Sequence, residues 1–185
     1  SDGYEGTMTF ADGGLYVGKW FKGLQHNSGV YTYPNGDVFE GEFKNGARLD
    51  AHGKMNYANG DIYVGQWVAD KRHGEGKMQY ASGDEYSGAW AAGMHLLGQR
   101  KFVATGHVYD GEWLNDEPHG HGKMTYGSDW QEGNASMRDG DVYEGPWENG
   151  RHAEGEVFIT YQNGDLYRGG YAQSLRHGQG RMEYA

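Results

Sequence analysis

The chain has no cysteine, only three prolines and no long apolar run, and each shortage excludes a class of protein. Without cysteine it forms neither disulfides nor thiolate zinc sites. No apolar stretch approaches the roughly 18 residues of a membrane-spanning helix. The scarcity of proline and the lack of a Gly-X-Y period argue against collagen and disorder. The chain begins at Ser1 without a methionine and shows no signal peptide, so we expect a fragment of a longer protein.

Positive charge is also scarce. Lys and Arg number 16 against 26 Asp and Glu, which gives a formal net charge of −10. Nucleic acids and anionic membranes select basic surfaces, so the composition predicts no nucleic-acid partner and at most a weak phospholipid contact. The densest basic spot is Lys71-Arg72, far short of the roughly four to eight cations that mark a lipid-headgroup site.

Glycine and aromatic residues, by contrast, are both abundant. The chain has 34 glycines in 185 residues, and aromatics make up 15%. A disordered glycine-rich tract would hold few aromatics. The two together predict short strands joined by many turns.

The glycines and aromatics follow an internal repeat. The pattern Gly-x-x-(Tyr/Phe)-x-Gly-x-(Trp/Phe/Tyr) begins at Gly13, Gly36, Gly60, Gly83, Gly106, Gly140 and Gly164. A second half-motif, Gly-x-Met-x-Tyr, follows, as in Gly53-Lys-Met55-Asn-Tyr57, and one such half-motif, 6–10, precedes the first copy. Of the 27 aromatic residues, 22 fall on three fixed positions of this repeat, which chance does not explain. We predict a partial repeat at 1–12 and seven repeats over 13–185.

The spacing of two residues within each half-motif predicts strands. Tyr16, Gly18 and Trp20 would share one face, while Val17 and Lys19 on the other face meet water. The repeats predict about 15 strands, each unit touching only its neighbours. The predicted fold class is all-β: an elongated single-layer antiparallel sheet of stacked β-hairpins. The glycine between two aromatics leaves room for the rings to tilt over it.

The turns are predicted from their glycines. Asn-Gly, Ser-Gly and Asp-Gly steps between repeats favour two-residue hairpin turns with positive φ. These steps are Asn35-Gly36, Asn59-Gly60, Ser82-Gly83, Asp139-Gly140 and Asn163-Gly164. The connections inside the repeats, such as residues 70–74, are predicted to be longer loops.

These residues resemble the MORN repeat (membrane occupation and recognition nexus), whose pattern is close to YxGxW…GxGxxxY with a period near 23. The resemblance covers nearly the whole chain, from Gly3 to Ala185. It implies an elongated β-hairpin array that acts as a scaffold in cytoskeleton, flagella or membrane junctions. It further implies peptide binding along an aromatic groove, homodimers through the array ends, and phosphoinositide binding as a recurring suggestion.

Three places depart from the repeat. The fourth copy has Gly98, Arg100 and Phe102 at the half-motif positions, with one extra residue in the following turn. The fifth carries an insertion at about 127–137 that contains Trp130, a candidate protruding loop. The sixth has Val157 where the second glycine is expected. We expect a kink or bulge at the first and third of these places.

The apolar face of the sheet is the main candidate site. A single-layer sheet has no second layer to cover that face, and exposed apolar patches mark partner sites. Alternatively the rings are simply the core, and both interpretations can hold together. The predicted partner-binding groove consists of Tyr16, Trp20, Phe39, Phe43, Tyr63, Trp67, Tyr86, Trp90, Tyr109, Trp113, Tyr143 and Trp147.

No catalytic residue, metal site or cofactor is predicted. His26, His73, His119 and His177 recur along the repeat, so they do not converge as metal ligands must, and we interpret them as loop residues. The stretches 74–77 and 120–123 lack the Ser/Thr and the helix of a phosphate-binding loop. The scattered Asp and Glu residues form no paired constellation, and a thin ribbon supplies no deep pocket for acid–base catalysis.

The sequence therefore predicts a non-catalytic scaffold rather than an enzyme. It would bind a protein or peptide partner and form a homodimer through one array end, most simply Tyr167, Tyr171, Met182 and Tyr184, because open terminal strands invite pairing. A cytoplasmic location at the cytoskeleton or membrane-associated cortex is expected from the resemblance. The alternatives are a peripheral phosphoinositide-binding module and a targeting module of a larger enzyme.

Overall fold

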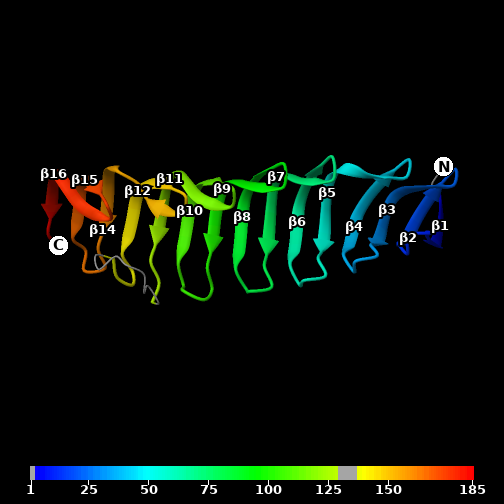
Figure 1. The fold of residues 1–185 in the computed structure, drawn as a ribbon. Coiled ribbons are helices and arrows are strands. Elements are labelled where there is room, and N and C mark those ends of the chain that lie inside the picture. The colour runs from blue at the N-terminus through cyan, green and yellow to red at the C-terminus, as the bar shows by residue number, and fades with distance from the viewer. Residues whose placement is uncertain (1–2, 129–136) are drawn as a thin grey trace. The chain divides into compact units, whose positions relative to one another are not determined.

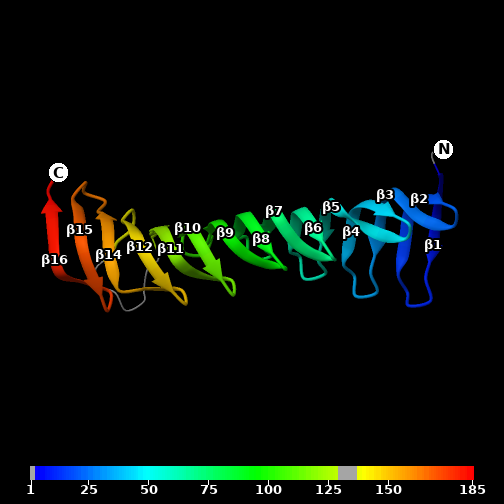
Figure 2. The ribbon, with the colours of Figure 1, turned by 90° about the horizontal axis from the view of Figure 1, so that it is seen from above.

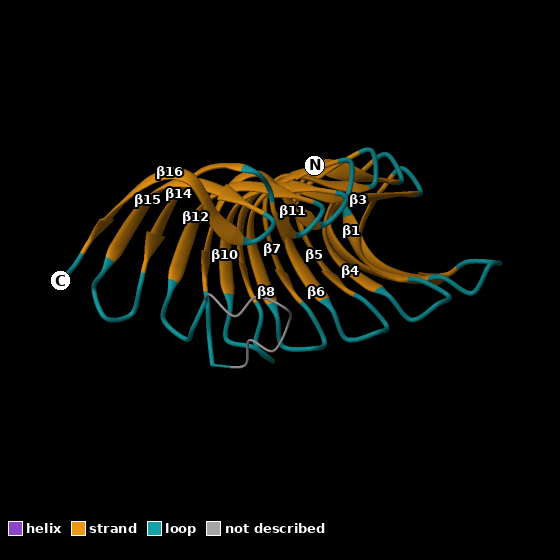
Figure 3. Ribbon diagram, turned by 60° about the vertical axis from the view of Figure 1, so that its left-hand side comes forward, coloured by secondary structure: helices purple, strands orange, loops and turns teal. Residues whose placement is uncertain are grey.

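The computed structural model describes residues 3–128 and 137–185. Within these ranges it contains sixteen strands and no helix (Figures 1 and 3). None of the described residues therefore forms a helix suited to crossing a membrane. The predicted all-β fold of antiparallel hairpins is confirmed.

The chain divides into two compact units. The first comprises Ser1–Ala81 with Ala89–Gly93, and the second comprises Ser82–Gly88 with Met94–Ala185. Strand β8 (Glu85–Ala91) contributes residues to both. Within each unit, most strands that follow one another in sequence pair antiparallel, as the two views in Figures 1 and 2 show.

The first unit holds seven further strands: β1 (Tyr4–Thr9), β2 (Leu15–Phe21), β3 (Leu24–Thr32), β4 (Val38–Lys44), β5 (Ala47–Asn56), β6 (Ile62–Val68) and β7 (Lys71–Gln79). The second unit holds eight: β9 (Met94–Lys101), β10 (Val108–Leu114), β11 (Glu117–Thr125), β12 (Val142–Glu148), β13 (Arg151–His152), β14 (Gly155–Thr160), β15 (Leu166–Ala172) and β16 (Leu175–Glu183).

The connections inside the repeats are two-residue turns, so the prediction of longer loops there was wrong. Val68 pairs with Lys71 across Ala69 and Asp70, whose φ angles are 47° and 63°. Two successive residues with positive φ form a type I′ turn, whose twist matches that of the flanking strands. The same pair of positive φ angles occurs at residues 22–23, 45–46, 92–93, 115–116, 149–150 and 173–174. Only two of these seven pairs, 69–70 and 173–174, lack both glycine and asparagine, whereas Asn45-Gly46 and Asn149-Gly150 carry the expected turn signal, which the prediction overlooked.

The connections between repeats are one residue longer than predicted. The Tyr33 N–H donates to the Asp37 carbonyl at 2.8 Å, and the Gly36 N–H donates to the Tyr33 carbonyl at 3.0 Å. Gly36 has φ 93°, whereas Asn35 is not among the residues with positive φ. This is a three-residue loop in which a type I turn precedes a left-handed glycine. Equivalent loops follow Tyr57 and Tyr161.

Two of the three departures from the repeat have visible consequences. The extra residue of the fourth copy lengthens the loop to four residues, 103–106, closed by the Phe102 N–H donating to the His107 carbonyl at 2.9 Å. In the sixth copy the second half is interrupted between β13 and β14, where residues 145–146 of β12 oppose residues 153–157, so the expected kink or bulge takes the form of a bulge. The insertion at about 127–137, with Trp130, lies mostly outside the described residues.

A bulge interrupts the pairing inside the repeats. The register of β6 and β7 shifts between Gly65 and Gln66, and equivalent shifts occur after Gly18, Gly41, Gly111 and Gly169. A bulge bends the strand and leaves backbone groups without ladder partners. It therefore places free carbonyls beside the aromatic ring that precedes it.

One carboxylate joins the beginning of most repeats to the end of the same repeat. Asp61 Oδ1 accepts the Ala81 N–H at 2.8 Å, and Asp37 Oδ1 accepts the Ala58 N–H at 2.8 Å. The same link joins Asp84 to Val103, Asp141 to Gln162 and Asp165 to Ala185. Where His107 replaces the aspartate, its Nδ1 accepts the Gly127 N–H at 2.9 Å.

Candidate functional site

The twelve predicted groove residues are all buried. Their exposed fractions lie between 0% and 6%, and the five tyrosines among them are at 0%. In this structure the rings form the core of each unit. That a partner touches these rings remains a prediction, since any contact must come through neighbouring, more exposed side chains.

The rings pack edge to face from repeat to repeat. The centroid of Tyr63 lies 5.1 Å from that of Trp67 with the planes at 88°, and 5.3 Å from that of Trp90 with the planes at 82°. Such T-shaped pairs are the favoured geometry for aromatic quadrupoles. Each ring thus contacts its own repeat and the next, which holds the apolar face together without a second layer.

The polar atoms of the buried rings reach backbone carbonyls. The Tyr63 hydroxyl donates to the Gln66 carbonyl at the bulge, at 2.9 Å, and burial raises the pKa of this hydroxyl to about 12. The Trp67 indole N–H donates to the Gly53 carbonyl of the preceding repeat at 3.2 Å. Trp90, Trp113 and Trp147 make the same bond to Gly76, Gly98 and Gly122.

The repeated glycines make room for these rings, as predicted. A Cβ on Gly76 would overlap the Tyr63 ring, and one on Gly122 would overlap the Tyr109 ring. The glycines also face one another across the strands, because Gly65 pairs with Gly76. The aromatic core therefore depends on glycine at these positions, because a larger residue would overlap the rings.

A second series of side chains covers the rings, and sequence reasoning missed it. Each member is the fifth residue after the last aromatic of the motif, and six of the seven pair with that aromatic across the type I′ hairpin. We call them the cap residues: Gln25, Arg48, Arg72, His95, Pro118, His152 and Arg176. The fixed offset was the available signal, but the residue types vary too much to reveal a motif.

The charged caps lie directly on aromatic rings. The Arg48 guanidinium carbon is 4.8 Å from the Phe39 centroid and 4.9 Å from that of Trp67. His95 stacks on Tyr86 with centroids 3.9 Å apart, and His152 stacks on Tyr143 at the same separation. Cations and imidazoles over ring faces gain cation–π and stacking energy. The ring-bearing face therefore carries spaced basic groups although the chain is acidic.

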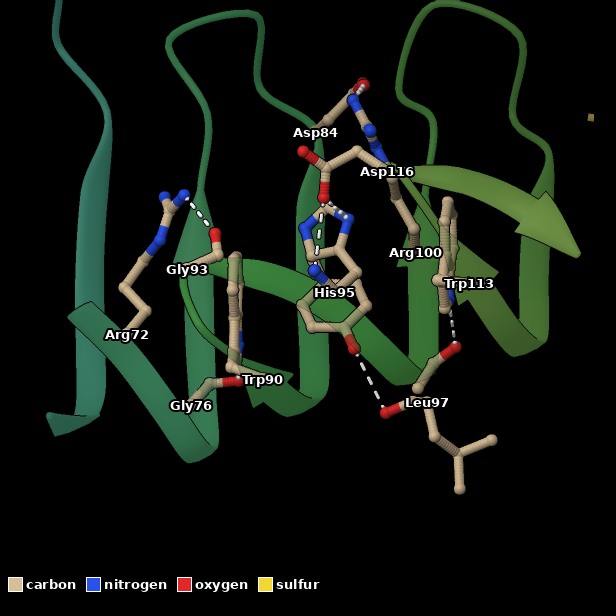
Figure 4. Close-up of polar contacts among 12 residues, drawn as sticks. Arg72, Gly76, Asp84, Trp90, Gly93, His95, Leu97, Arg100, Trp113 and Asp116 are labelled. Carbon is tan, nitrogen blue, oxygen red and sulfur yellow. Dashed lines mark hydrogen bonds and ion pairs between the residues drawn. The ribbon is translucent and has the colours of Figure 1, made fainter. Parts of the chain in front are cut away.

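Acidic residues in the type I′ turns balance two of these caps. The Arg48 Nε donates to Asp70 Oδ1 at 2.7 Å, and His95 Nδ1 lies 3.0 Å from Asp116 Oδ1. Figure 4 shows His95 with Asp116, and beside them Arg100 paired with Asp84 at 2.9 Å. The arginine at this methionine position of the fourth copy therefore keeps a counter-ion.

An open depression lies on the ring-bearing face in each unit. In the first unit a depression of about 560 Å³ is lined by Phe10, Gln25, Tyr31, Tyr33, Phe43, Gly46, Ala47, Arg48, Ala69 and Asp70. In the second unit one of about 460 Å³ is lined chiefly by Tyr161, Tyr171, Leu175, Arg176, Met182 and Arg138. Tyr31, Tyr33 and Tyr161 are half-buried, so parts of their rings are open to a ligand.

The residues of the predicted dimer end differ in exposure. Tyr167 and Tyr171 are buried, at 7% and 2% exposed, whereas Tyr184 is 78% exposed and Met182 is intermediate. Met182 lies on β16, which is exposed along most of its length, and Tyr184 directly follows the end of that strand. Only Met182 and Tyr184 are therefore open to a second copy in this structure.

The histidines of the repeat stay apart. His73 and His177 are exposed, and His26 lies 5.3 Å from the ring of Phe21. Across residues 3–128 and 137–185, no three His, Cys, Asp or Glu residues gather in a way that would hold a metal ion. The sequence Asn134-Ala-Ser136, which has the spelling of an N-glycosylation site, lies outside the described residues.

Solved structures that are similar to this chain include domains of SAS-4 and CPAP. The TCP domain of Drosophila melanogaster SAS-4 (dCPAP), in complex with a proline-rich motif of Ana2 (dSTIL), is 16% identical, with 98% of this chain and 90% of that chain covered and a TM-score of 0.43. The TCP10 domain of Danio rerio CPAP is 11% identical, with 97% and 83% covered and a TM-score of 0.47. At these identities and scores they carry no argument about function. No curated protein sequence matches the chain.

A family profile matches more than half of the chain. The profile described as MORN repeat matches residues 16–38, 39–62, 63–85, 109–131 and 167–185. It leaves out the copies that begin at Gly83 and Gly140, which contain the departures at Arg100 and Val157. The predicted count of seven repeats therefore remains a prediction, but five matched repeats built on one Tyr-Gly-Trp ladder place the chain in the MORN-repeat family.

Proposed function

We propose that this chain is a non-catalytic scaffold that binds an extended segment of a protein partner on its ring-bearing face. The observation that carries the proposal is the depression in the first unit, where half-exposed Tyr31 and Tyr33 lie beside Arg48 above a buried aromatic floor. Ligand sites in proteins are typically concave and apolar with a few fixed polar groups. The depression has that composition.

The rings of the depression suit the side chains of a peptide. The Tyr31 and Tyr33 rings, with centroids 4.7 Å apart, are half-buried and would receive apolar side chains. Because stacking and the Asp70 ion pair already hold Arg48 in place, little ordering of this side chain would oppose binding.

A peptide-display selection tests this proposal. Random 12-residue peptides would be selected on the wild-type chain, and the best would be measured by fluorescence polarisation against Tyr33→Ala. Loss of one aromatic contact should weaken binding about tenfold or more. Val64→Ala, an exposed side chain of β6, is the matched control and should bind like wild type. Equal binding by Tyr33→Ala, or no selectable peptide, would reject the groove.

Self-assembly is the second part of the proposal. The chain would form a homodimer through Met182 on β16 and Tyr184 just after it, with Tyr167 and Tyr171 behind them. Sedimentation at high concentration should give twice the monomer mass of 20.6 kDa, and Tyr184→Asp should restore the monomer. A monomer mass for wild type at all concentrations would exclude this dimer.

We further propose a cytoplasmic location at the cytoskeleton or the membrane-associated cortex. Imaging a fluorescent fusion alongside a cytoskeletal marker tests this assignment. Flotation with phosphoinositide vesicles tests the lipid-binding alternative, for which weak, salt-sensitive association is the most that the net charge of −10 allows.

A further inference from the structure

The cap residues and the type I′ turns form a pattern of paired charges. In two places a basic cap lies against an aspartate at the second position of the next type I′ turn. These pairs are Arg48 with Asp70 and His95 with Asp116. The fold thus places a carboxylate beside an arginine or histidine cap, about one repeat further along the chain.

For Arg72, the residue at the second position of the next type I′ turn is Gly93, which has no side chain. The Arg72 Nη2 instead donates to the Gly93 carbonyl at 2.6 Å (Figure 4). Its guanidinium carbon lies 4.5 Å from the Trp90 centroid and 6.0 Å from that of Tyr63. No carboxylate within residues 3–128 and 137–185 forms an ion pair with Arg72. The guanidinium is therefore held in place, half-buried, without a counter-ion.

We propose that Arg72 binds the side-chain carboxylate of an Asp or Glu residue in the partner peptide, at the place that Asp70 fills for Arg48. This inference rests on the proposed function and names the partner chemistry of the same face. The planar guanidinium presents five N–H donors and matches a carboxylate in two-point geometry. Trp90 lies over the guanidinium, which also hydrogen-bonds the Tyr57 side chain, and these contacts fix it in a partly dehydrated place where a charge-assisted bond to a carboxylate is stronger than in water.

The surroundings favour a peptide carboxylate over a lipid phosphate. Phosphoinositide sites gather several cations, whereas the neighbouring cap in the first unit, Arg48, is already neutralised by Asp70. The net charge of −10 also opposes approach to an anionic membrane. One cation on an aromatic face suits a single acidic side chain within an otherwise apolar extended segment.

The test places the missing carboxylate in the protein itself. Gly93→Asp should pair with Arg72 and occupy the site from within. Asp70 and Asp116 adopt φ 63° and 62° at the equivalent position, and no atom lies within 4 Å of a Cβ built on Gly93, so an aspartate fits there. Gly93→Asn adds the same bulk without charge. Gly23→Asp, in the equivalent turn of the first hairpin and with equally open space, controls for net charge.

The experiment selects displayed random 12-residue peptides on the wild-type chain and on each variant. Wild type, Gly93→Asn and Gly23→Asp should enrich peptides with one Asp or Glu at a fixed distance from an apolar residue. Gly93→Asp and Arg72→Gln should lose this enrichment. Replacing the acid of a selected peptide by its amide should weaken binding to wild type about tenfold, as expected for one charged hydrogen bond, and leave binding to Gly93→Asp unchanged.

Three outcomes overturn the inference. Peptides selected without an acidic preference would remove the role of Arg72 and leave the groove intact. Failure to select any peptide would reject the groove as well. Flotation of the protein with phosphatidylinositol 4,5-bisphosphate vesicles that falls in Gly93→Asp but not in Gly23→Asp would assign Arg72 to a phosphate ligand instead.

Discussion

The imidazole of His152 lies face to face with the phenol ring of Tyr143, with ring centroids 3.9 Å apart and 19° between the planes. Its Nε2 is 2.5 Å from the hydroxyl oxygen of Tyr126. Burial at this place lowers the pKa of His152 from the usual 6.5 to about 4, because the charged form loses its hydration. The folded chain therefore carries this histidine neutral at pH 7.

This histidine should make the stability depend on pH. Between pH 6.5 and about 4 the unfolded chain binds a proton at His152 that the folded chain does not, so the free energy of unfolding falls as the pH falls through this window. The full shift corresponds to on the order of 3 kcal/mol. Above pH 6.5 both states are neutral and the effect vanishes.

The measurement is urea unfolding of wild type and His152→Phe at about pH 7 and about pH 4.5. The phenylalanine keeps a stacking ring but cannot titrate, so the difference between the two pH values should shrink. His121→Phe, at an exposed position, should behave like wild type. If His152→Phe kept the wild-type difference, other groups would cause the acid sensitivity.

The contribution of each carboxylate link within a repeat should be measurable by hydrogen exchange at the amide that donates to it. Asp61→Ala removes the acceptor of the Ala81 N–H and should lower the free energy of unfolding by about 1–2 kcal/mol. Hydrogen exchange at the Ala81 amide should speed up more than exchange in the distant strand β2. Asp61→Asn keeps an oxygen acceptor and should recover part of the protection. Unchanged exchange at Ala81 in Asp61→Ala would show that the link contributes nothing.

The glycine beneath each tyrosine should tolerate no side chain. Gly76→Ala places a methyl group against the Tyr63 ring and should cost about 1–3 kcal/mol, as overpacking of a core does. Thermal unfolding compares this variant with Glu75→Ala, a truncation at the preceding, exposed residue. Equal melting temperatures for the two variants would mean that the ring moves aside without cost.

A substitution in the type I′ turn at Ala69 should stabilise the protein. Ala69 adopts φ 47°, a conformation that costs a residue with a Cβ about 1 kcal/mol but suits asparagine, which occupies the same position at Asn45, Asn115 and Asn149. Ala69→Asn should therefore raise the free energy of unfolding by about 0.5–1 kcal/mol. Asn115→Ala should lower it by a similar amount. A destabilised Ala69→Asn would contradict the role assigned to the turn.

The fold was largely predictable because the sequence motif that specifies it is repeated along the chain. The Tyr-Gly-Trp spacing fixes which residues share a face, and the burial of Tyr16, Tyr63 and Tyr109 follows from it. The turns were not predictable in the same way. Ala69 and Gln173 adopt a left-handed backbone conformation because the register of the hairpin requires it. Neither residue type favours that conformation, so the sequence did not indicate it.

The site was only half predictable. The aromatic floor could be read from the sequence, but the caps could not, because the bulge breaks the alternation of faces that would assign Arg48 and Arg72 to the ring side. Their residue types also differ, since Gln25, Pro118 and His152 fill the same place by shape rather than by chemistry. A pattern that repeats in position but not in residue type becomes visible only with coordinates.

The indole bonds described above join residues in adjacent repeats, such as Trp67 with Gly53, and the carboxylate bonds join the two ends of one repeat, such as Asp61 with Ala81. No such bond spans two repeats, so a whole copy added or removed within a unit leaves every remaining side chain with the same kind of neighbour. A gene that duplicates or loses about 23 residues in register therefore changes the length of the binding face without redesigning its core. A change by any other number of residues would place a glycine under no ring and a ring over no glycine.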